Sequence, residues 1–385
     1  MMFRWLLFIA FIILFNWYAS QAIKTVFKNS WFQYGYYIIN LIIISNFLFQ
    51  IYFMNKNGNA GPLFSYSLGL FLITVVFQII IILFMLLEDA FRIPQWFYHF
   101  FSKGFSQSFR FMPDRRVFVS QLAILIASIP ASALFIGMLR GKYSYRVINH
   151  DLIFDNLPYD FDGFKIAHIS DFHCGSFDNE EKIRYGIEMI NQQNPDIILF
   201  TGDMVNNIAD EVIPWKKLIS SLKAPYGKYA IMGNHDYGDY YRWENDLEKQ
   251  KNFNQLIQFE EEMGFKVLLN SSEIINKSDS SIRIIGVENW GSGGFKKNGD
   301  LDLAIKGVKS EEFKILLSHD PSHFKEKVIN HKEHFDLTLS GHTHGMQFGI
   351  EIPGWFKWSP IKYRYKYWAG IYNELNQFIN VNRGF

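Results

Sequence analysis

Four long apolar stretches occupy the first 140 residues and constrain the fold more than any other feature of the chain. They cover residues 3–18, 36–53, 63–87 and 117–139. Because a helix needs about 20 apolar residues to cross a bilayer core, we predict a transmembrane unit of about four helices over residues 1–140. Buried helices of a soluble domain are the alternative interpretation of the same stretches.

Charge divides the chain near the same place. Residues 1–150 hold 12 Lys and Arg against 3 Asp and Glu, a net charge of +9, whereas residues 151–385 hold 26 against 34, a net charge of −8. The two parts are therefore expected to have different surroundings. The acidic second part offers no bulk basic surface, so no nucleic-acid partner is expected.

Positive residues beside the predicted spans indicate the orientation of the chain. With four spans, the loops at 19–35 and 88–116 share one side and carry seven Lys and Arg, against five on the other side. Since positive loops favour the cytoplasm, the second part is predicted to be extracytoplasmic. Cleavage of the first stretch as a signal peptide near Ser20-Gln21-Ala22 is the competing interpretation. A helix at 93–101, with Pro94 in its first turn, is expected to lie in the membrane interface or to pack against the bundle.

Beyond residue 141, short apolar strands alternate with amphipathic helices, a pattern typical of a layered α/β fold. Strands are predicted at 147–154, 165–170, 196–200, 229–232, 313–317 and 335–339, and helices at 183–192 and 212–222. Shorter strands at 266–270, 273–276 and 282–287 indicate a second sheet. The site of such a fold is expected beyond the strand ends.

Polar clusters follow several of these strands. The side chains in these clusters that can bind a metal ion or transfer a proton are Asp171, His173, Asp203, Asn234, His235, Asp236, His319, His342 and His344. Imidazole and carboxylate together suit Mn, Fe or Zn rather than Ca, and Asp203 is well placed to bridge two ions. Two divalent metal ions would polarise a phosphoryl group and lower the pKa of a shared water. His235 can exchange a proton near neutral pH, and Asp236 can steady its imidazole.

The order of these clusters resembles the calcineurin-like metallophosphoesterase superfamily, and most of all its bacterial membrane-anchored branch. The matching motifs, within residues 146–385, are Asp171-Phe172-His173, Gly202-Asp203, Gly233-Asn234-His235-Asp236, His319 and Gly341-His342-Thr343-His344. The resemblance implies two β-sheets packed as a sandwich with helices outside. It also implies that Asp171, His173, Asp203 and His344 hold one metal, and that Asp203, Asn234, His319 and His342 hold the other. In this scheme His235 protonates the leaving oxygen, with Asp236 orienting it.

Two features depart from the family pattern. Met346 replaces the glycine usual after the last motif, which is expected to narrow that loop. The sequence ends at Phe385, where family members usually continue into a last strand. Either the sequence is a fragment or the second sheet is expected to be short.

Several residues outside the motifs have simpler interpretations. The single cysteine, Cys174, excludes an internal disulfide and is expected to be a small apolar filler. His168 is expected to be a hydrogen-bonded structural residue. His323, His331 and His334 lie in a charged stretch and are expected to be solvated.

Residues 361–367 alternate aromatic or aliphatic side chains with Lys362, Arg364 and Lys366. The alternation predicts a strand with tyrosines on one face and bases on the other. One interpretation is contact with the bilayer, with the bases on lipid headgroups. The other is an aromatic core strand with a solvated basic face.

These features predict a transmembrane unit at 1–140 and a metallophosphoesterase domain at 141–385. The expected activity is hydrolysis of a phosphoester or pyrophosphate bond by attack of a metal-bridging hydroxide, on a lipid-borne or envelope substrate. A tethered phosphodiesterase for soluble nucleotides or sugars is the alternative enzyme. A non-enzymatic membrane sensor or scaffold is the alternative class, which lost ligands would indicate; none of the motif ligands is missing.

Overall fold

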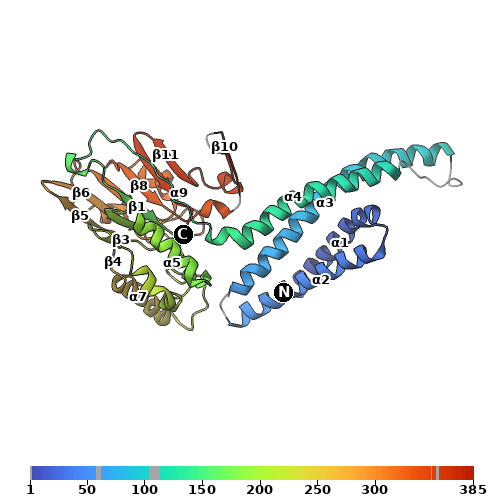
Figure 1. The fold of residues 1–385 in the computed structure, drawn as a ribbon, viewed down its shortest axis with the longest axis horizontal. Helices are drawn as coiled ribbons and strands as arrows, with labels where there is room; N and C mark the ends of the chain where they lie inside the picture. The colour runs from blue at the N-terminus through green and yellow to red at the C-terminus, as the bar shows by residue number, and fades with distance from the viewer. Residues whose placement is uncertain (1, 58–61, 104–112, 348, 353–354) are drawn as a thin grey trace. The chain divides into compact units, whose positions relative to one another are not determined.

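The computed structural model describes residues 2–57, 62–103, 113–347, 349–352 and 355–385. The chain divides into two compact units, Met1–Ser144 and Tyr145–Phe385 (Figure 1). Each unit has its own hydrophobic core. The first unit is helical, and the second contains the β-sheets.

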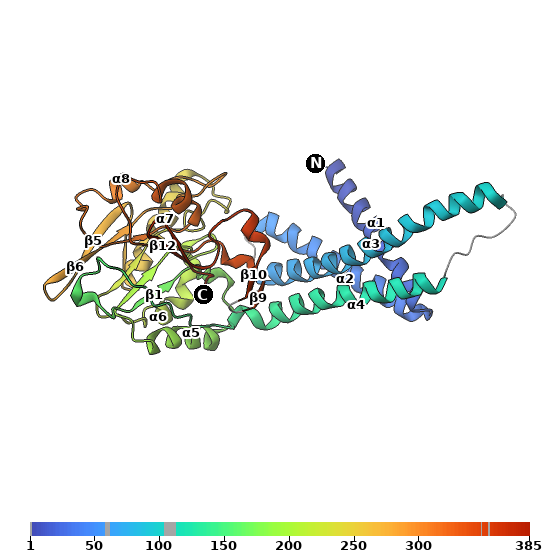
Figure 2. The ribbon, with the colours of Figure 1, turned by 90° about the horizontal axis from the view of Figure 1, so that it is seen from above.

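Four long helices form the first unit. They are α1 (Met2–Val26), α2 (Ser30–Asn57), α3 (Pro62–Lys103) and α4 (Pro113–Arg140). Each contains a stretch long and apolar enough to cross a membrane. Helix α3 contacts the other three (Figure 2), and many large apolar side chains face outward from the bundle. An apolar outer surface over helical backbone is what hydrocarbon surroundings require.

Amide side chains inside the bundle connect three of these helices. The Nε2 atom of Gln78 on α3 lies 2.9 Å from Oδ1 of Asn16 on α1 and 2.8 Å from Oδ1 of Asn40 on α2. Such hydrogen bonds are typical of helix contacts within membranes. They fix how α1, α2 and α3 meet.

The separate helix predicted at 93–101 is wrong. Helix α3 continues through Pro94 to Lys103, so Pro94 lies inside a helix rather than in its first turn. Proline removes one backbone donor, and long transmembrane helices tolerate this loss because the remaining turns keep their hydrogen bonds. Residues 104–112 of the predicted loop lie outside the described residues.

Two main β-sheets form the second unit. The first contains β1 (Ile166–Ile169), β2 (Ile197–Phe200), β3 (Lys228–Ala230) and β4 (Phe265–Val267), all parallel. The second has six strands in the order β11 (Gly370–Glu374), β12 (Gln377–Val381), β8 (Leu337–Ser340), β7 (Lys314–Leu317), β6 (Ser280–Gly286) and β5 (Ser271–Lys277). Within it β12, β8, β7 and β6 run parallel. A small sheet pairs β9 (Ile350–Ile352) with β10 (Phe356–Trp358).

The two main sheets pack face to face. Leu199 and Ile231 from the first side meet Ile284, Ile315 and Leu339 from the second in one core. Helices α5 (Glu180–Gln192) and α7 (Asp246–Glu262) lie outside the first sheet (Figure 1). The far face of the second sheet is covered by α8 (Leu301–Ala304) and by the helical segment of α9 (Pro321–His323) and Phe324–Val328. The predicted two-sheet sandwich flanked by helices is therefore confirmed.

Some predicted elements do not form as expected. Residues 147–154 are not a strand, although Leu152 and Phe154 pack against the core. The helix predicted at 212–222 is a 3-10 segment, Ala209–Trp215, followed by the single turn α6 (Lys216–Ile219), because Pro214 removes a helical donor. In both places apolar side chains are buried, but the backbone does not form the regular strand or helix that the hydrophobic pattern predicted.

Sheet membership also differs from the prediction. The strand predicted at 266–270 forms as β4 and joins the first sheet, whereas β5 and β6 belong to the second. Among the described residues the second sheet has six strands, and β12, near the end of the sequence, pairs between β11 and β8. Residues 361–367 are not a strand, because Pro360–Tyr363 forms a 3-10 helix.

Candidate active site

The polar clusters gather where parallel strands of both sheets end. Strand β1 leads to Asp171 and His173, β2 leads to Asp203, and β3 leads to Asn234 and His235. From the second sheet, β7 leads to His319 and β8 leads to His342 and His344. Parallel strands present their carboxyl ends at one edge, so residues far apart in sequence meet there.

Five of the seven predicted metal ligands have a left-handed backbone. The φ angles are 55° at Asp171, 49° at His173, 60° at Asp203, 70° at His342 and 48° at His344. This conformation costs a residue with a Cβ roughly 1–2 kcal/mol. Strain of this kind concentrates at functional sites, where it directs side chains that a regular backbone would not.

Two glycines make room for the buried carboxylates. A Cβ on Gly233 would lie 2.2 Å from Oδ1 of Asp203, and a Cβ on Gly341 would lie 2.3 Å from Oδ2 of Asp171. Both contacts are far shorter than a van der Waals distance. Glycine is thus required at each position for the neighbouring loop to approach.

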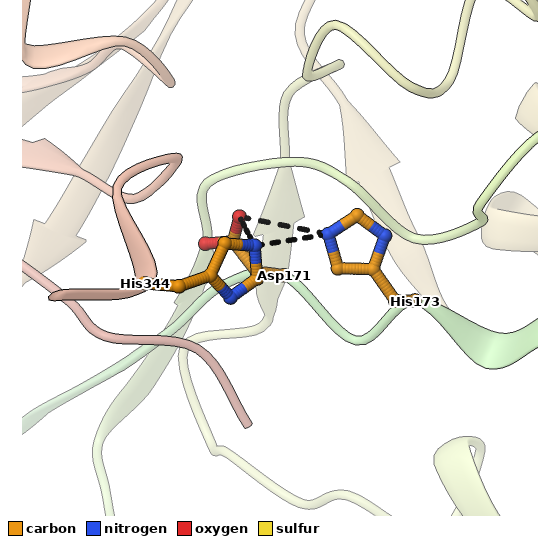
Figure 3. A group of neighbouring side chains, drawn as sticks. All are labelled: Asp171, His173 and His344. Atoms are coloured by element: carbon orange, nitrogen blue, oxygen red, sulfur yellow. Dashed lines mark hydrogen bonds and ion pairs between the residues drawn. The ribbon is translucent and has the colours of Figure 1, made fainter. Parts of the chain in front are cut away.

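Asp171, His173 and His344 form the first group of donors, and Figure 3 shows their side chains pointing toward one another. Nε2 of His344 lies 3.2 Å from Oδ1 of Asp171 and 3.1 Å from Nε2 of His173. Imidazole nitrogens and a carboxylate oxygen converging in this way are a donor set that fits a divalent cation.

Asp203, Asn234, His319 and His342 form the second group. Nε2 of His319 lies 3.1 Å from Oδ2 of Asp203 and 3.1 Å from Oδ1 of Asn234. Nδ1 of His342 lies 2.7 Å from the same Asn234 oxygen. Oδ2 of Asp203 is also 3.6 Å from Nε2 of His173 in the first group. One carboxylate oxygen therefore faces both groups.

Partners on the far side of two imidazoles set which nitrogen can bind a cation. Nδ1 of His319 lies 2.7 Å from the carbonyl of Thr201, to which it can only donate, so Nε2 is the nitrogen that faces the site. Nε2 of His342 lies 2.9 Å from the hydroxyl of Tyr365 and 3.4 Å from Oδ2 of Asp320, which leaves Nδ1 for the site. Contacts of this kind orient metal-binding histidines in proteins.

Burial and neighbouring charge shift the pKa values of these groups. Burial raises the pKa of Asp203, but the imidazoles of His319 and His235 outweigh it and hold that pKa well below its usual range. Burial lowers the pKa of His319, but Asp203 outweighs it and brings that pKa to about 10. Burial lowers the pKa of His173 to about 4. Buried carboxylates need compensating positive charge, so the donor set fits divalent cations.

His235 lies beside both groups. Its Nδ1 is 2.7 Å from the carbonyl of Asn206, and its ring centroid is 4.8 Å from that of His173 and 4.5 Å from that of Tyr240. The carbonyl can only accept, so Nδ1 carries the proton and Nε2 is left to exchange one. The backbone of Asn206, rather than a carboxylate, fixes the imidazole.

Asp236 does not orient His235, and that part of the prediction is wrong. Its buried carboxylate accepts hydrogen bonds from the backbone N–H groups of Gly233, Asp203, Met204 and Val205. Burial, with a contribution from Asp203, raises its pKa to about 7. Asp236 therefore ties together the loops that follow β2 and β3.

Three side chains around the site were not predicted from the sequence. The hydroxyl of Tyr240 accepts from Nδ2 of Asn234 at 2.9 Å. Tyr365 and Asp320 contact His342, as described above. Asp320 directly follows His319 and Tyr240 lies six residues after Asn234, so both had a usable signal, whereas Tyr365 lies 23 residues after His342.

The predictions for the histidines and the cysteine outside the motifs are confirmed in some cases and wrong in others. His168 is hydrogen-bonded, with Nε2 3.0 Å from Oγ1 of Thr201, and Cys174 is buried, as predicted. His323 is buried and 2.8 Å from Oγ of Ser318, so its predicted solvation is wrong. His334 is exposed and His331 is half-buried. The side chain of Met346 lies outside the described residues.

Comparison with known proteins finds families that match both units of the chain. Residues 164–346 match the family described as calcineurin-like phosphoesterase, and residues 3–142 match the family described as probable calcineurin-like phosphoesterase, transmembrane domain. The metallophosphoesterase YkuE of Bacillus subtilis is 30% identical over 276 residues, which cover 68% of this chain and 87% of that protein. A metallophosphoesterase of Aquifex aeolicus is 29% identical over 220 residues, which cover 55% of this chain and 77% of that protein. A transmembrane protein with metallophosphoesterase domain from Danio rerio is 25% identical over 240 residues, which cover 60% of this chain and 51% of that protein.

The fold and the donor set define a metal-dependent hydrolase of phosphoester bonds. The chain belongs to the calcineurin-like metallophosphoesterase family and carries the four-helix transmembrane domain found with it. It is thus a multi-pass integral membrane protein with a phosphoesterase domain.

Proposed function

We propose that this protein uses two divalent cations to hydrolyse a phosphoester or pyrophosphate bond in a lipid-borne or envelope substrate. The observation that carries the proposal is the position of Asp203, whose Oδ2 lies 3.1 Å from His319 and 3.6 Å from His173. In this proposal Asp171, His173, Asp203 and His344 hold one cation, and Asp203, Asn234, His319 and His342 hold the other.

Cations bound there would polarise the phosphoryl group and lower the pKa of water, and manganese, iron and zinc all suit the donors. His235 adds proton transfer. With Nδ1 donating to the carbonyl of Asn206, Nε2 protonates the oxygen of the leaving group. The ring of Tyr240, 4.5 Å away, packs against the imidazole and limits its rotation.

A membrane-borne substrate is supported by the connection between the two units. The fourth apolar span ends at Tyr143, and the catalytic unit begins at Tyr145. Without a spacer, the catalytic unit stays close to the bilayer, where lipid-linked substrates are concentrated. A soluble substrate would need no such tether.

The extracytoplasmic side is proposed for the catalytic unit. Seven Lys and Arg border the spans on the side of the first and third loops, against five on the side of the chain ends. The more positive side is expected in the cytoplasm, so the ends and the catalytic unit lie outside it.

The test uses the full-length protein in detergent with Mn²⁺. Phospholipids, nucleotide-linked lipids, soluble nucleotides and a chromogenic diester are compared as substrates, with and without a chelator. We expect chelator-sensitive hydrolysis with a preference for lipid-linked phosphate, reduced by Asn234→Ala and by His235→Ala but not by the exposed control His334→Ala. Turnover of soluble nucleotides alone would contradict the lipid substrate, and activity untouched by both site substitutions would contradict the site.

A further inference from the structure

The segment that follows the last histidine of the site exposes large apolar side chains. Trp355, directly before β10, is 81% exposed, and Tyr363 is 78% exposed. Ile352 and Phe356 are exposed as well. Soluble surfaces seldom carry so many large apolar side chains within a dozen residues, and such clusters mark contact sites.

The same segment is basic within an acidic unit. Residues 350–368 contain four Lys and Arg and one Glu, whereas residues 151–385 together have a net charge of −8. Glu351 pairs with Arg383, and Lys366 pairs with Glu374. Lys362 and Arg364 are exposed and have no carboxylate partner among the described residues. The segment therefore offers two positive charges to an outside partner.

These side chains are joined to the active-site loop. Oγ of Ser359 donates to the carbonyl of Gly345 at 3.1 Å, and Oγ1 of Thr343 donates to the carbonyl of Trp368 at 2.7 Å. Both contacts fall on the loop that carries His342 and His344. A partner bound to the exposed segment is consequently held next to the candidate metal centre.

We propose that residues 355–364, which include the 3-10 helix Pro360–Tyr363, dock the catalytic unit on an anionic bilayer surface. Trp355, Phe356 and Tyr363 enter the interfacial layer, and Lys362 and Arg364 meet lipid phosphates. Aromatic rings and cationic side chains are the composition that this layer selects. The direct connection to the fourth span keeps a bilayer within reach. The inference rests on the proposed function for its lipid substrate and adds the surface that meets the membrane.

The experiment places a fluorescent probe on this surface in the full-length protein. The only native cysteine, Cys174, is buried, so a cysteine introduced at the surface can be labelled selectively. Trp355→Cys is compared with the matched control Tyr159→Cys, a position that is 91% exposed. Both variants are labelled with an environment-sensitive dye and placed in nanodiscs of phosphatidylcholine and phosphatidylglycerol. Nitroxide lipids then report contact with lipid, and iodide reports contact with water.

We expect nitroxide lipids to quench the probe at position 355 at least about twofold more than the probe at position 159. Adding Lys362→Glu and Arg364→Glu should remove the difference, whereas Lys306→Glu with Lys309→Glu should preserve it. Equal lipid quenching at the two positions would overturn the proposal. So would a probe at position 355 shielded from both quenchers, which indicates a protein partner. Because the readout does not involve turnover, its failure is distinct from failure of the proposed hydrolysis.

Discussion

The hydroxyl of Tyr365 lies 2.9 Å from Nε2 of His342 and 3.4 Å from Oδ2 of Asp320. Burial, followed by the charge of Asp320, raises the pKa of Tyr365, so its hydroxyl keeps its proton. His342 can then donate from Nε2 to Tyr365, and Tyr365 can donate to Asp320. This chain holds Nδ1 of His342 toward the second group of donors. Tyr365 and Asp320 are positioning residues in this arrangement.

Tyr365→Phe removes this partner of His342 while keeping the ring. We expect the Mn²⁺ concentration for half-maximal activity to rise by about tenfold or more, since partners behind metal ligands contribute about 10–100-fold to metal affinity. The control is Tyr367→Phe, a buried tyrosine whose hydroxyl bonds to Glu374 instead. Equal effects of the two substitutions would show that the contact with His342 has no positioning role.

His235→Ala should slow chemistry without releasing metal. The loss in kcat is expected to be about 10²–10⁴-fold for an ester with a poor leaving group, because general acids contribute about this much. A nitrophenyl ester leaves without protonation, so its loss should be much smaller. Metal content and kcat are measured together for both substrates. An equal loss on the two esters, or loss of bound metal, would contradict the role of His235 as the acid.

Asp236→Asn tests the revised role of that residue. The carboxylate accepts four backbone N–H groups, and an amide NH₂ would face some of them without accepting. We expect a lower melting temperature and weaker Mn²⁺ binding, because the loops of Asp203 and Asn234 lose a common anchor. Unchanged metal binding with only kcat reduced would favour the orienting role that the sequence suggested.

Metal affinity should depend on pH through His319, whose proton is stabilised by the charge of Asp203. The pKa of His319 is raised to about 10, so the metal-free protein carries this proton at neutral pH. A cation at Nε2 must displace the proton, and the apparent affinity therefore rises with pH, by up to about tenfold per unit below pH 10. The pKa of His173 is lowered to about 4, so His173 has no proton to release near neutrality. Calorimetry in two buffers of different ionisation enthalpy measures how many protons are released when Mn²⁺ binds. Release of no proton would contradict the presence of a proton on Nε2 of His319 in the metal-free protein.

Sequence reasoning succeeded where burial leaves a simple pattern. Strands β2, β7 and β8 are buried on both faces, so they appear as continuous apolar runs, and the polar residues after them mark the strand ends. Because the strands are parallel, those ends coincide in space. The membrane helices were found for a similar reason, since length and hydrophobicity alone define them.

The surroundings of the site were harder to predict because they depend on long-range packing. Residues 361–367 alternate like a strand, yet Pro360–Tyr363 form a 3-10 helix, and Tyr365, two residues beyond it, reaches His342. His323 lies among charged neighbours in sequence but is buried beside Ser318. Asp236 follows His235, yet its carboxylate turns to four backbone donors. The partners of Tyr365 and most of those of Asp236 come from distant loops, and the hydrogen bond between His323 and Ser318 depends on a helical turn after β7 that buries the imidazole.

The most direct test of the account is the number of Mn²⁺ ions bound per chain, measured by mass spectrometry on full-length protein in detergent after removal of free metal. Oδ2 of Asp203 faces both donor groups, so we predict two ions in the wild type and fewer than two in Asp203→Asn. The matched variant His334→Ala should keep two. A wild-type protein that is fully active with one ion, or an Asp203→Asn variant that retains two, would contradict the shared carboxylate.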